Sequence, residues 1–190
     1  MEIGRGAEAV INLENGCVRK HRLPKSYRLE QLDEVLRQER TLREAKIISD
    51  ARKYGVPTPI IYDIQRFELD MQHIDGQRLK DIINAELSER VGETVGRLHK
   101  AGIIHGDLTT SNMILYENRV YLIDFGLAFY ENSIEAQGVD VHVYFQTLQS
   151  THDNSDGLIE AFKRGYAKTY EEADAVFNRV NEIKARGRYL

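Results

Sequence analysis

Three side chains near the middle of the sequence have the types and spacing that phosphoryl transfer requires. Asp107 lies in the run His-Gly-Asp-Leu-Thr-Thr-Ser-Asn, which ends at Asn112, and Asp124 begins the tripeptide Asp-Phe-Gly. Asp107 could orient a hydroxyl group or a water molecule, while Asn112 and Asp124 could hold Mg²⁺, which prefers hard oxygen ligands. We therefore expect Asp107 to be catalytic and Asn112 and Asp124 to be metal ligands.

The segment between the two motifs reads as a β-hairpin that would fix the distance from Asn112 to Asp124. Residues 113–116 and 120–123 are apolar β-formers, and the polar residues 117–119 form a short turn between them. Taken alone, Asp-Phe-Gly is a common turn and His-Gly-Asp a common loop end. Found together in this order and at this spacing, they favour a catalytic site.

Composition places few restrictions on partners. The chain has 190 residues, enough for one compact unit or two lobes that share a cleft, and its formal net charge is -4, so any nucleic-acid binding must be local. The single cysteine, Cys17, excludes an intrachain disulfide, fits a reducing compartment and is predicted to be a buried strand residue rather than a nucleophile. No apolar stretch is long enough to span a membrane and no secretion signal is visible, so we expect a cytoplasmic protein.

Hydrophobic periodicity divides the chain into a sheet-rich first part and a helix-rich second part. Strands are expected over 10–13, 17–21, 60–64 and 67–74, with an Asn-Gly turn at 15–16, and residues 29–54 form one long helix or two abutting ones. Residues 75 and 76, Asp-Gly, mark the boundary. We thus predict an α+β, bilobal protein-kinase-like fold, with an N-lobe over 1–74 and a C-lobe over 75–190.

The C-lobe should be helical apart from the catalytic hairpin. Apolar positions stripe one helix that ends at Gly102 and another over residues 173–183. Gly92 and Gly96 share a face of the first of these helices, which indicates close packing against a neighbouring element rather than a ligand site.

The N-lobe should supply the remaining nucleotide contacts. Gly4 and Gly6 lie in the run Gly-Arg-Gly-Ala-Glu-Ala ahead of the first expected strand, where backbone amides could approach phosphates, although a flexible terminus explains them as well. Lys20 ends the second strand on the same face as Val18 and could reach the α and β phosphates. Arg22 is the alternative cation.

A lysine in a cleft needs an acidic partner, and the long helix offers two. Glu44 lies nearer the inward apolar stripe than Glu39 does, so Glu44 is the preferred partner of Lys20. An ordinary surface pair between Arg40 and Glu44, four residues apart, remains the alternative.

With these residues in place, the sequence resembles a known family, the atypical kinase subunit of the KEOPS (EKC) complex. RIO kinases and aminoglycoside-type kinases are similar by the same signs but more distant. The resemblance spans almost the whole chain and rests on five stretches: residues 20–28, residues 32–33, Arg43-Glu44-Ala45, the run 105–112 and the ending Arg-Gly-Arg at 186–188.

The resemblance implies an ATP- and Mg²⁺-dependent atypical Ser/Thr kinase or ATPase that supports threonylcarbamoyladenosine modification of tRNA. Its partners would be the threonylcarbamoyl-transferring subunit and a small regulatory subunit. The family aligns Lys20 with Glu44 as an ion pair, Asp107 as the catalytic residue, and Asn112 and Asp124 as metal ligands, which agrees with the reading of the residues themselves.

The sequence departs from ordinary protein kinases after the Asp-Phe-Gly. Only residues 127–139 precede Asp140 and no Ala-Pro-Glu follows, so we predict a minimal activation segment without a peptide-docking platform. Gly106 replaces the arginine that would bind an activation-loop phosphate, so loop phosphorylation is not expected to regulate the site. Asp140 either accepts backbone hydrogen bonds from the catalytic loop or caps a helix. His105 should pack and bond to backbone rather than act as a base.

The chain ends in a small basic tail. Lys184, Arg186 and Arg188 either stabilise a helix C-terminus or, by the resemblance, contact tRNA. Two further functions stay open: a scaffold that bridges complex subunits and tRNA while hydrolysing little ATP, and a small-molecule kinase.

Overall fold

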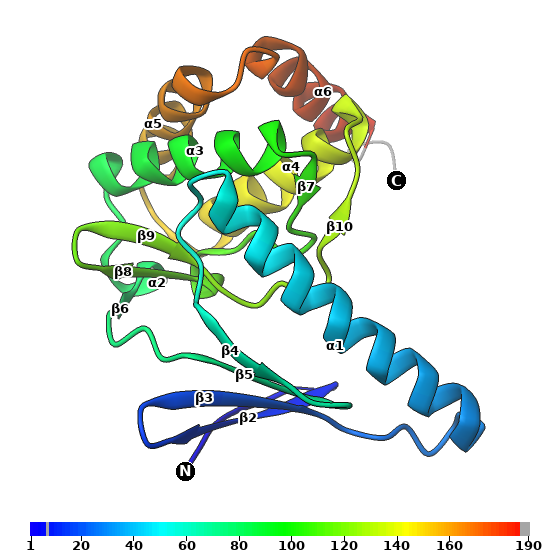
Figure 1. The fold of residues 1–190 in the computed structure, drawn as a ribbon. Coiled ribbons are helices and arrows are strands. Elements are labelled where there is room, and N and C mark those ends of the chain that lie inside the picture. Colours follow the sequence, from blue (N-terminus) through cyan, green and yellow to red (C-terminus); the bar gives the residue numbers. More distant parts are fainter. Residues whose placement is uncertain (7, 187–190) are drawn as a thin grey trace.

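The N-terminal part of the protein is built on an antiparallel sheet of five strands. A computed structural model describes residues 1–6 and 8–186, and Figure 1 shows this sheet at one end of the molecule with helix α1 running beside it. The strand order is β1-β2-β3-β5-β4, and every neighbouring pair is antiparallel. The strands are β1 (Glu2–Arg5), β2 (Ala9–Glu14), β3 (Cys17–Arg22), β4 (Ile61–Ile64) and β5 (Glu68–Gln72).

The hairpin of β2 and β3 forms around the predicted Asn-Gly turn. Asn15 and Gly16 have φ angles of 51° and 76°, the left-handed pair that a two-residue hairpin turn requires. Cys17, expected to be a buried strand residue, is the first residue of β3 but is only half-buried.

The expectation that the glycine run precedes the first strand was wrong. Gly4 lies inside β1, paired with Ile11 of β2, so Gly6 and Glu8, here called the glycine loop, lie between two paired strands. Strand β1 has only four residues, is mostly exposed and lacks the apolar alternation that would predict a strand. Main-chain pairing with β2 holds it in place instead.

A single helix, α1 (Glu30–Lys53), follows the sheet and confirms the first of the two predicted options. Its inward face buries Ala45, Ile47, Ile48 and Ala51. The helix ends where Gly55 adopts a φ of 77°, and the prolines at 57 and 59 keep the chain from returning to a helix.

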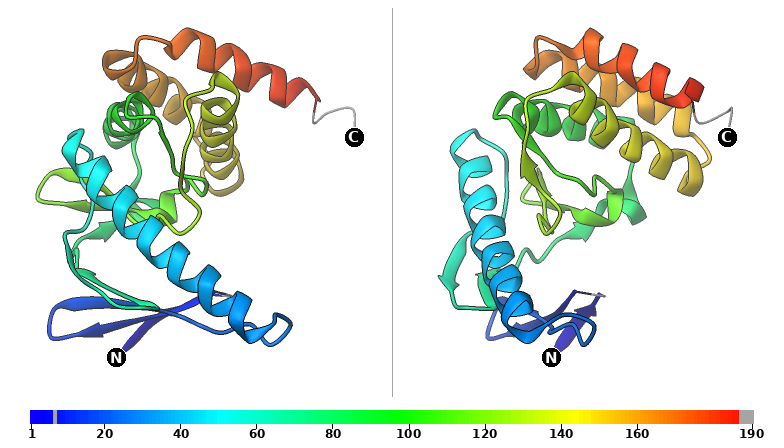
Figure 2. Two further views of the ribbon diagram at one scale, coloured as in Figure 1. Left: turned by 45° about the vertical axis from the view of Figure 1, so that its right-hand side comes forward. Right: turned by 90° about the vertical axis from the view of Figure 1, so that its right-hand side faces the viewer.

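The second part of the protein is mainly helical, as predicted. Figure 2 shows its long helices gathered at the end of the molecule opposite the sheet. They are α3 (Ala85–Lys100), α4 (Ile134–Thr151), α5 (Ser155–Thr169) and α6 (Ala173–Arg186), with a short α2 (Leu79–Ile82) ahead of them. The short elements are β6 (Gln77–Arg78), β7 (Ile103–Ile104), the 3₁₀ turn Thr110–Asn112, β8 (Met113–Tyr116), β9 (Arg119–Leu122) and β10 (Phe129–Tyr130).

Glycines allow α3 and α5 to pack backbone against backbone. A Cβ atom on Gly92 would lie 2.1 Å from the carbonyl oxygen of Phe162, and one on Gly165 would lie 1.8 Å from that of Glu89. These distances are far below van der Waals contact, so a side chain at either position would force the helices apart. The predicted packing role of Gly92 is confirmed.

The expected lobe boundary falls in the segment that joins β5 to β6. Gly76 packs so closely on β8 that a Cβ atom there would lie 2.3 Å from the carbonyl oxygen of Leu115. One continuous apolar cluster contains residues of both parts, among them Ile48 of α1 and Leu108 and Phe125 of the catalytic segments. Among the residues that the structure describes, no helix is long and apolar enough to cross a membrane.

Candidate active site

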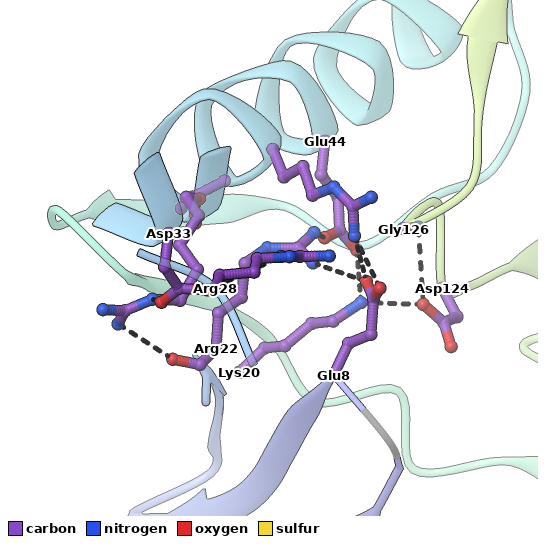
Figure 3. A network of polar contacts seen from close by, with 11 residues as sticks. Glu8, Lys20, Arg22, Arg28, Asp33, Glu44, Asp124 and Gly126 are labelled. Atoms are coloured by element: carbon purple, nitrogen blue, oxygen red, sulfur yellow. Dashed lines mark hydrogen bonds and ion pairs between the residues drawn. The ribbon is translucent and has the colours of Figure 1, made fainter. Parts of the chain in front are cut away.

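Lys20 is the centre of an ion-pair network between the two lobes. Its Nζ lies 2.7 Å from Glu44 Oε1 and 2.7 Å from Asp124 Oδ1, and Figure 3 shows the three side chains converging from β3, α1 and the segment after β9. Burial alone would lower the pKa of Lys20, but the carboxylates of Glu44 and Asp124 outweigh burial and raise it. The lysine is therefore a cation held between two carboxylates.

Glu44 is the acidic partner, as predicted. It is buried on α1, whereas Glu39 is exposed. The alternative surface pair of Arg40 with Glu44 was wrong, because Arg40 reaches the glycine loop instead and contacts Glu8. The second oxygen of Glu44 accepts a hydrogen bond from Arg22, so two cations hold this carboxylate in place.

Arg22 is a member of this site that the sequence reasoning treated only as a rival of Lys20. Alternation along β3 places residues 18, 20 and 22 on the same face, and that signal was available. Both cations fit because Glu44 Oε1 binds Lys20 while Glu44 Oε2 binds Arg22.

Asp107 and Asn112 are held against each other in the catalytic loop. Asn112 Nδ2 donates to the main-chain oxygen of Asp107 at 3.0 Å and to its Oδ2 at 2.8 Å. This leaves the amide oxygen of Asn112 free of hydrogen bonds from the described residues. The arrangement fixes the carboxylate of Asp107 and presents an oxygen suited to a hard cation.

The predicted hairpin between Asn112 and Asp124 is confirmed, with a tighter turn than expected. Strand β9 begins at Arg119, so only Glu117 and Asn118 form the turn, with φ angles of 46° and 57°. A main-chain hydrogen bond of 3.0 Å from the nitrogen of Ile123 to the oxygen of Asn112 closes the open end. The two proposed metal ligands are thus tied through the ladder of β8 and β9.

Asp124 has a backbone conformation that is rare for a residue with a side chain. Its φ is 59°, and its Oδ1 accepts hydrogen bonds from Lys20 at 2.7 Å and from the nitrogen of Gly126 at 3.4 Å. Burial would raise the pKa of Asp124, but Lys20 and these hydrogen bonds outweigh it and lower the pKa. The carboxylate is charged at neutral pH, and its Oδ2 accepts no hydrogen bond from the described part of the chain.

Asp140 of α4 holds the catalytic loop in place through hydrogen bonds to its backbone. Its side chain accepts hydrogen bonds from the backbone nitrogens of His105 and Gly106, both at 2.9 Å, and contacts His99 Nε2 at 3.1 Å. Asp140 lies within α4 rather than at its start, so the helix-cap alternative was wrong. Burial opposes the charged form, but His99 and the other donors outweigh it and lower the pKa of Asp140.

His105 has the packing role expected of it. Its ring lies 4.8 Å from that of Phe125, and its Nε2 is 3.1 Å from the main-chain oxygen of Ile123.

The backbone at position 106 requires a glycine, which was not predicted from the sequence. Its φ is 80°, and a Cβ atom there would lie 2.5 Å from the oxygen of Leu127, so an arginine would not fit this backbone.

Two cavities that share Ile11, Lys20 and Asp124 lie along the cleft. One, of about 210 Å³, is largely apolar and is lined by Val18, Met71 and Ile114 among others. The other, of about 240 Å³, is lined by Gly6, Glu8, Arg22, Asp107 and Gly126 among others. The shared residues place the two cavities side by side, and apolar walls next to the charged Lys20 and Asp124 suit a ligand with a flat base and a phosphate tail.

The glycine loop meets the second cavity through Gly6, while Gly4 lies in β1. Nucleotide contact by Gly4 and Gly6 stays a prediction. Glu8 was not singled out from the sequence, although it is the acidic residue of the glycine run. Arg186 ends α6 and is exposed, and Arg188 lies outside the described residues.

The donor set fits Mg²⁺ only if phosphate completes it. No group of three or more His, Cys, Asp or Glu side chains within residues 1–6 and 8–186 could hold a metal ion. Asn112 and Asp124 would supply two oxygen ligands, and Mg²⁺ commonly takes its remaining ligands from water and substrate phosphates.

Comparison with known proteins places the chain in a family. The model of the RIO domain matches residues 18–152, which include Lys20, Glu44 and the whole catalytic segment. The chain belongs to the RIO-domain family. It is 45% identical over its full length to a probable serine/threonine-protein kinase BUD32 homolog of Archaeoglobus fulgidus, covering 97% of that protein. It is 40% identical to the KEOPS complex subunit Bud32 of Pyrococcus abyssi, with 98% of this chain and 95% of that one aligned.

Other relatives of this RIO-domain chain are longer. It is 55% identical to a probable bifunctional tRNA threonylcarbamoyladenosine biosynthesis protein of Methanosarcina acetivorans, where 98% of this chain aligns with 35% of that protein. The chain therefore spans about a third of the length of these bifunctional relatives.

Solved structures confirm the protein-kinase-like fold. The Rio2 kinase of Chaetomium thermophilum superposes with a TM-score of 0.67 at 16% identity, covering 96% of this chain and 71% of that one. The amicoumacin kinase hAmiN superposes with a TM-score of 0.66 at 12% identity, covering 90% and 72%. The predicted α+β class, with a strand-rich first part and a helical second part, is confirmed.

Proposed function

We propose that this chain binds ATP with Mg²⁺ and transfers the terminal phosphoryl group to a Ser/Thr hydroxyl or to water. The observation that carries the proposal is the closed ion-pair network of Lys20, Glu44 and Asp124. Beside it, Asp107 is fixed by Asn112 in the same cleft. These parts are the ones that kinase-type phosphoryl transfer needs, because the reaction depends on positioning and charge stabilisation.

Each side chain has a separate task in this proposal. Lys20 neutralises and orients the α and β phosphates, and Glu44 keeps Lys20 in place. Asp107 orients the attacking hydroxyl or water. Asn112 and Asp124 hold Mg²⁺, which supplies charge neutralisation between the phosphates when it is bound.

The segment that follows the Asp-Phe-Gly favours ATP hydrolysis over phosphorylation of docked peptides. Strand β10 at Phe129–Tyr130 pairs with β7, and α4 begins at Ile134. Little chain is left between them for a peptide platform. Water or a residue of a bound partner is therefore the favoured acceptor.

We further propose that the chain supports threonylcarbamoyladenosine modification of tRNA as a KEOPS component in the cytoplasm. Support comes from relatives named as a KEOPS complex subunit and as threonylcarbamoyladenosine biosynthesis proteins. In the bifunctional relatives the matching segment is part of a longer chain, which suggests that this segment works beside a threonylcarbamoyl-transferring partner. A small regulatory subunit and tRNA contact through Arg186 and Arg188 complete the proposal.

The test is turnover of radiolabelled ATP, with free phosphate and protein-bound label followed separately. The purified chain would be assayed with and without Mg²⁺ and with and without a threonylcarbamoyl-transferring partner. We expect Mg²⁺-dependent turnover that Asp107→Asn abolishes, with label moving from protein to free phosphate when the partner is added. Turnover that persists in Asp107→Asn would contradict the assignment. Absence of turnover under every condition would favour the scaffold function.

A further inference from the structure

Glu8 of the glycine loop lies between the phosphate end of the cleft and a pocket lined by arginines. Glu8 and Arg22 line the cavity that contains Asp107. The same two residues also line a neighbouring pocket whose other walls include Arg28, Arg37 and Arg40. An acidic side chain therefore separates the proposed site of phosphoryl transfer from a group of cations.

The carboxylate of Glu8 is bound in the way that an anionic ligand would be. Arg40 Nη1 lies 2.6 Å from each oxygen of Glu8, and Arg22 Nη1 lies 3.7 Å from Glu8 Oε2. Figure 3 shows the side chain of Glu8 extending toward α1. The hydrogen bond from Arg40 lowers the pKa of Glu8 against the opposing effect of burial, so the carboxylate is charged at neutral pH.

The other arginines that line this pocket have carboxylates of their own. Arg37 pairs with Asp33 at 2.6 Å, Arg28 reaches the same carboxylate at 3.5 Å, and Arg22 is held by Glu44. Glu8 is thus the carboxylate that balances Arg40 among the residues that the structure describes. Both side chains of this pair are more than one-third exposed, at 35% for Arg40 and 40% for Glu8, so the contact can open at modest cost.

A carboxylate beside the phosphates of a nucleotide weakens nucleotide binding, unless nearby cations balance its charge. Like charges repel over several ångströms in a partly desolvated cleft. Removal of Glu8 would leave Arg40, and the Nη1 side of Arg22 that does not bind Glu44, open to a phosphate, and an arginine fork suits a tetrahedral oxyanion well. Glu8 and a phosphate group would then compete for the same pair of cations.

We propose that Arg22 and Arg40 form a phosphate-binding site at the end of the cleft, which Glu8 occupies between turnovers. The inference rests on the proposed function, since it assumes that nucleotide phosphates lie in the cavity lined by Asp107. The ligand is either the terminal phosphate of ATP or the inorganic phosphate that hydrolysis releases. By competing for the site, Glu8 keeps released phosphate from remaining bound.

The test compares Glu8→Gln, Arg40→Gln and the double variant. Affinities would be measured for ATP, for ADP, and for inorganic phosphate in the presence of ADP and Mg²⁺. Glu8→Gln should tighten phosphate binding roughly two- to fivefold, and Arg40→Gln should weaken it by a similar factor, as expected for partly exposed charges. The double variant should lose the gain of Glu8→Gln. A gain for ATP but not for ADP with phosphate would assign the site to the terminal phosphate of the nucleotide.

The result that distinguishes the inference is a change of phosphate affinity in opposite directions in the two single variants. If the pair merely held the glycine loop against α1, both single variants would weaken binding together, and that result would overturn the inference. A gain that persists in the double variant would overturn it as well, because the gain would not depend on Arg40. Glu14→Gln and Arg66→Gln, exposed charge changes in the same lobe, control for net charge, and melting temperatures control for folding.

The same experiment separates failure of this inference from failure of the proposed function. Wild-type protein that binds no nucleotide would refute the proposed function, and the phosphate site with it. Wild-type protein that binds ATP with Mg²⁺, but whose two single variants shift in the same direction, would refute only the phosphate site.

Discussion

The two halves of the cleft are held together by different means. On the C-lobe side, Asp140 is almost fully buried and accepts hydrogen bonds from the backbone nitrogens of His105 and Gly106. On the N-lobe side, long charged side chains reach across from separate elements, and the pair of Lys20 with Asp124 includes a carboxylate that is 44% exposed. The first arrangement fixes backbone, whereas the second fixes only the tips of side chains.

This difference assigns separate tasks to the two halves. Backbone hydrogen bonds to a buried carboxylate have few alternatives, so the catalytic loop should keep one geometry through the reaction. The pair of Arg40 with Glu8, by contrast, is more than one-third exposed on both sides, and exposed ion pairs are individually weak and can exchange partners. The N-lobe half can therefore adjust to phosphates that arrive and leave, while Asp107 stays in place.

The largest expected effect comes from removing the buried anchor. Asp140→Ala would leave two backbone N–H groups and His99 without their acceptor, which should lower the free energy of unfolding by about 3 kcal/mol. Denaturant unfolding would measure it, with Asp63→Ala on the exposed strand β4 as the control. A variant as stable as the wild type would show that Asp140 is not the anchor.

Breaking the ion-pair network at Lys20 should lower activity, in addition to the loss of stability expected when a buried pair is broken. Lys20→Ala removes the cation shared by Glu44 and Asp124, so ATP would be misplaced and kcat/KM should fall by about 100-fold. Steady-state ATP turnover would measure this, with Lys80→Ala as a control for loss of one exposed lysine. Unchanged turnover in Lys20→Ala would move the role to Arg22.

Acid should remove the stabilisation that the charged carboxylate of Asp140 provides. The folded protein lowers the pKa of Asp140 below its usual 3.8. The stabilisation from the charged form is therefore complete above that value and is lost as the pH falls through the lowered pKa of the folded state. Asp140→Asn should be less stable at neutral pH and lose less stability than the wild type below pH 3.8. Parallel acid-unfolding curves for the two proteins would contradict this.

The smallest effect is expected at the end of α6, outside both halves of the cleft. Replacing Arg186 and Arg188 with Gln should weaken tRNA binding by the assembled complex. The slope of the logarithm of the binding constant against the logarithm of the salt concentration should fall in magnitude by about 1 for each tRNA phosphate that is no longer bound. Affinity for ATP should not change. Arg66→Gln serves as a control for loss of a surface charge, and an unaltered tRNA affinity would remove the proposed role of these arginines.

Local patterns in the sequence were sufficient for most of the fold. The Asn-Gly turn, the stripe of α1 and the hairpin after Asn112 each depend on residues close in the chain, so periodicity and turn chemistry predicted them. Strand β1 was missed because its stability comes from pairing with β2 rather than from its own side chains.

The site was predictable where a spaced motif defined it, and not where distant segments meet. Asp107, Asn112 and Asp124 lie within one stretch of the chain. In contrast, Glu8 meets Arg40 from 32 residues away, and nothing in either local sequence specifies that pairing. The close approach of Gly106 to Leu127 is likewise visible only in three dimensions.

We propose above that Asp124 and Asn112 hold Mg²⁺ for a nucleotide bound to Lys20. The most direct test is calorimetric titration of ATP into wild type and Asp124→Ala, each with and without Mg²⁺. We predict that Mg²⁺ tightens binding to the wild type and that Asp124→Ala loses this increment while keeping its Mg²⁺-free affinity. An increment of equal size in both proteins would contradict the claim.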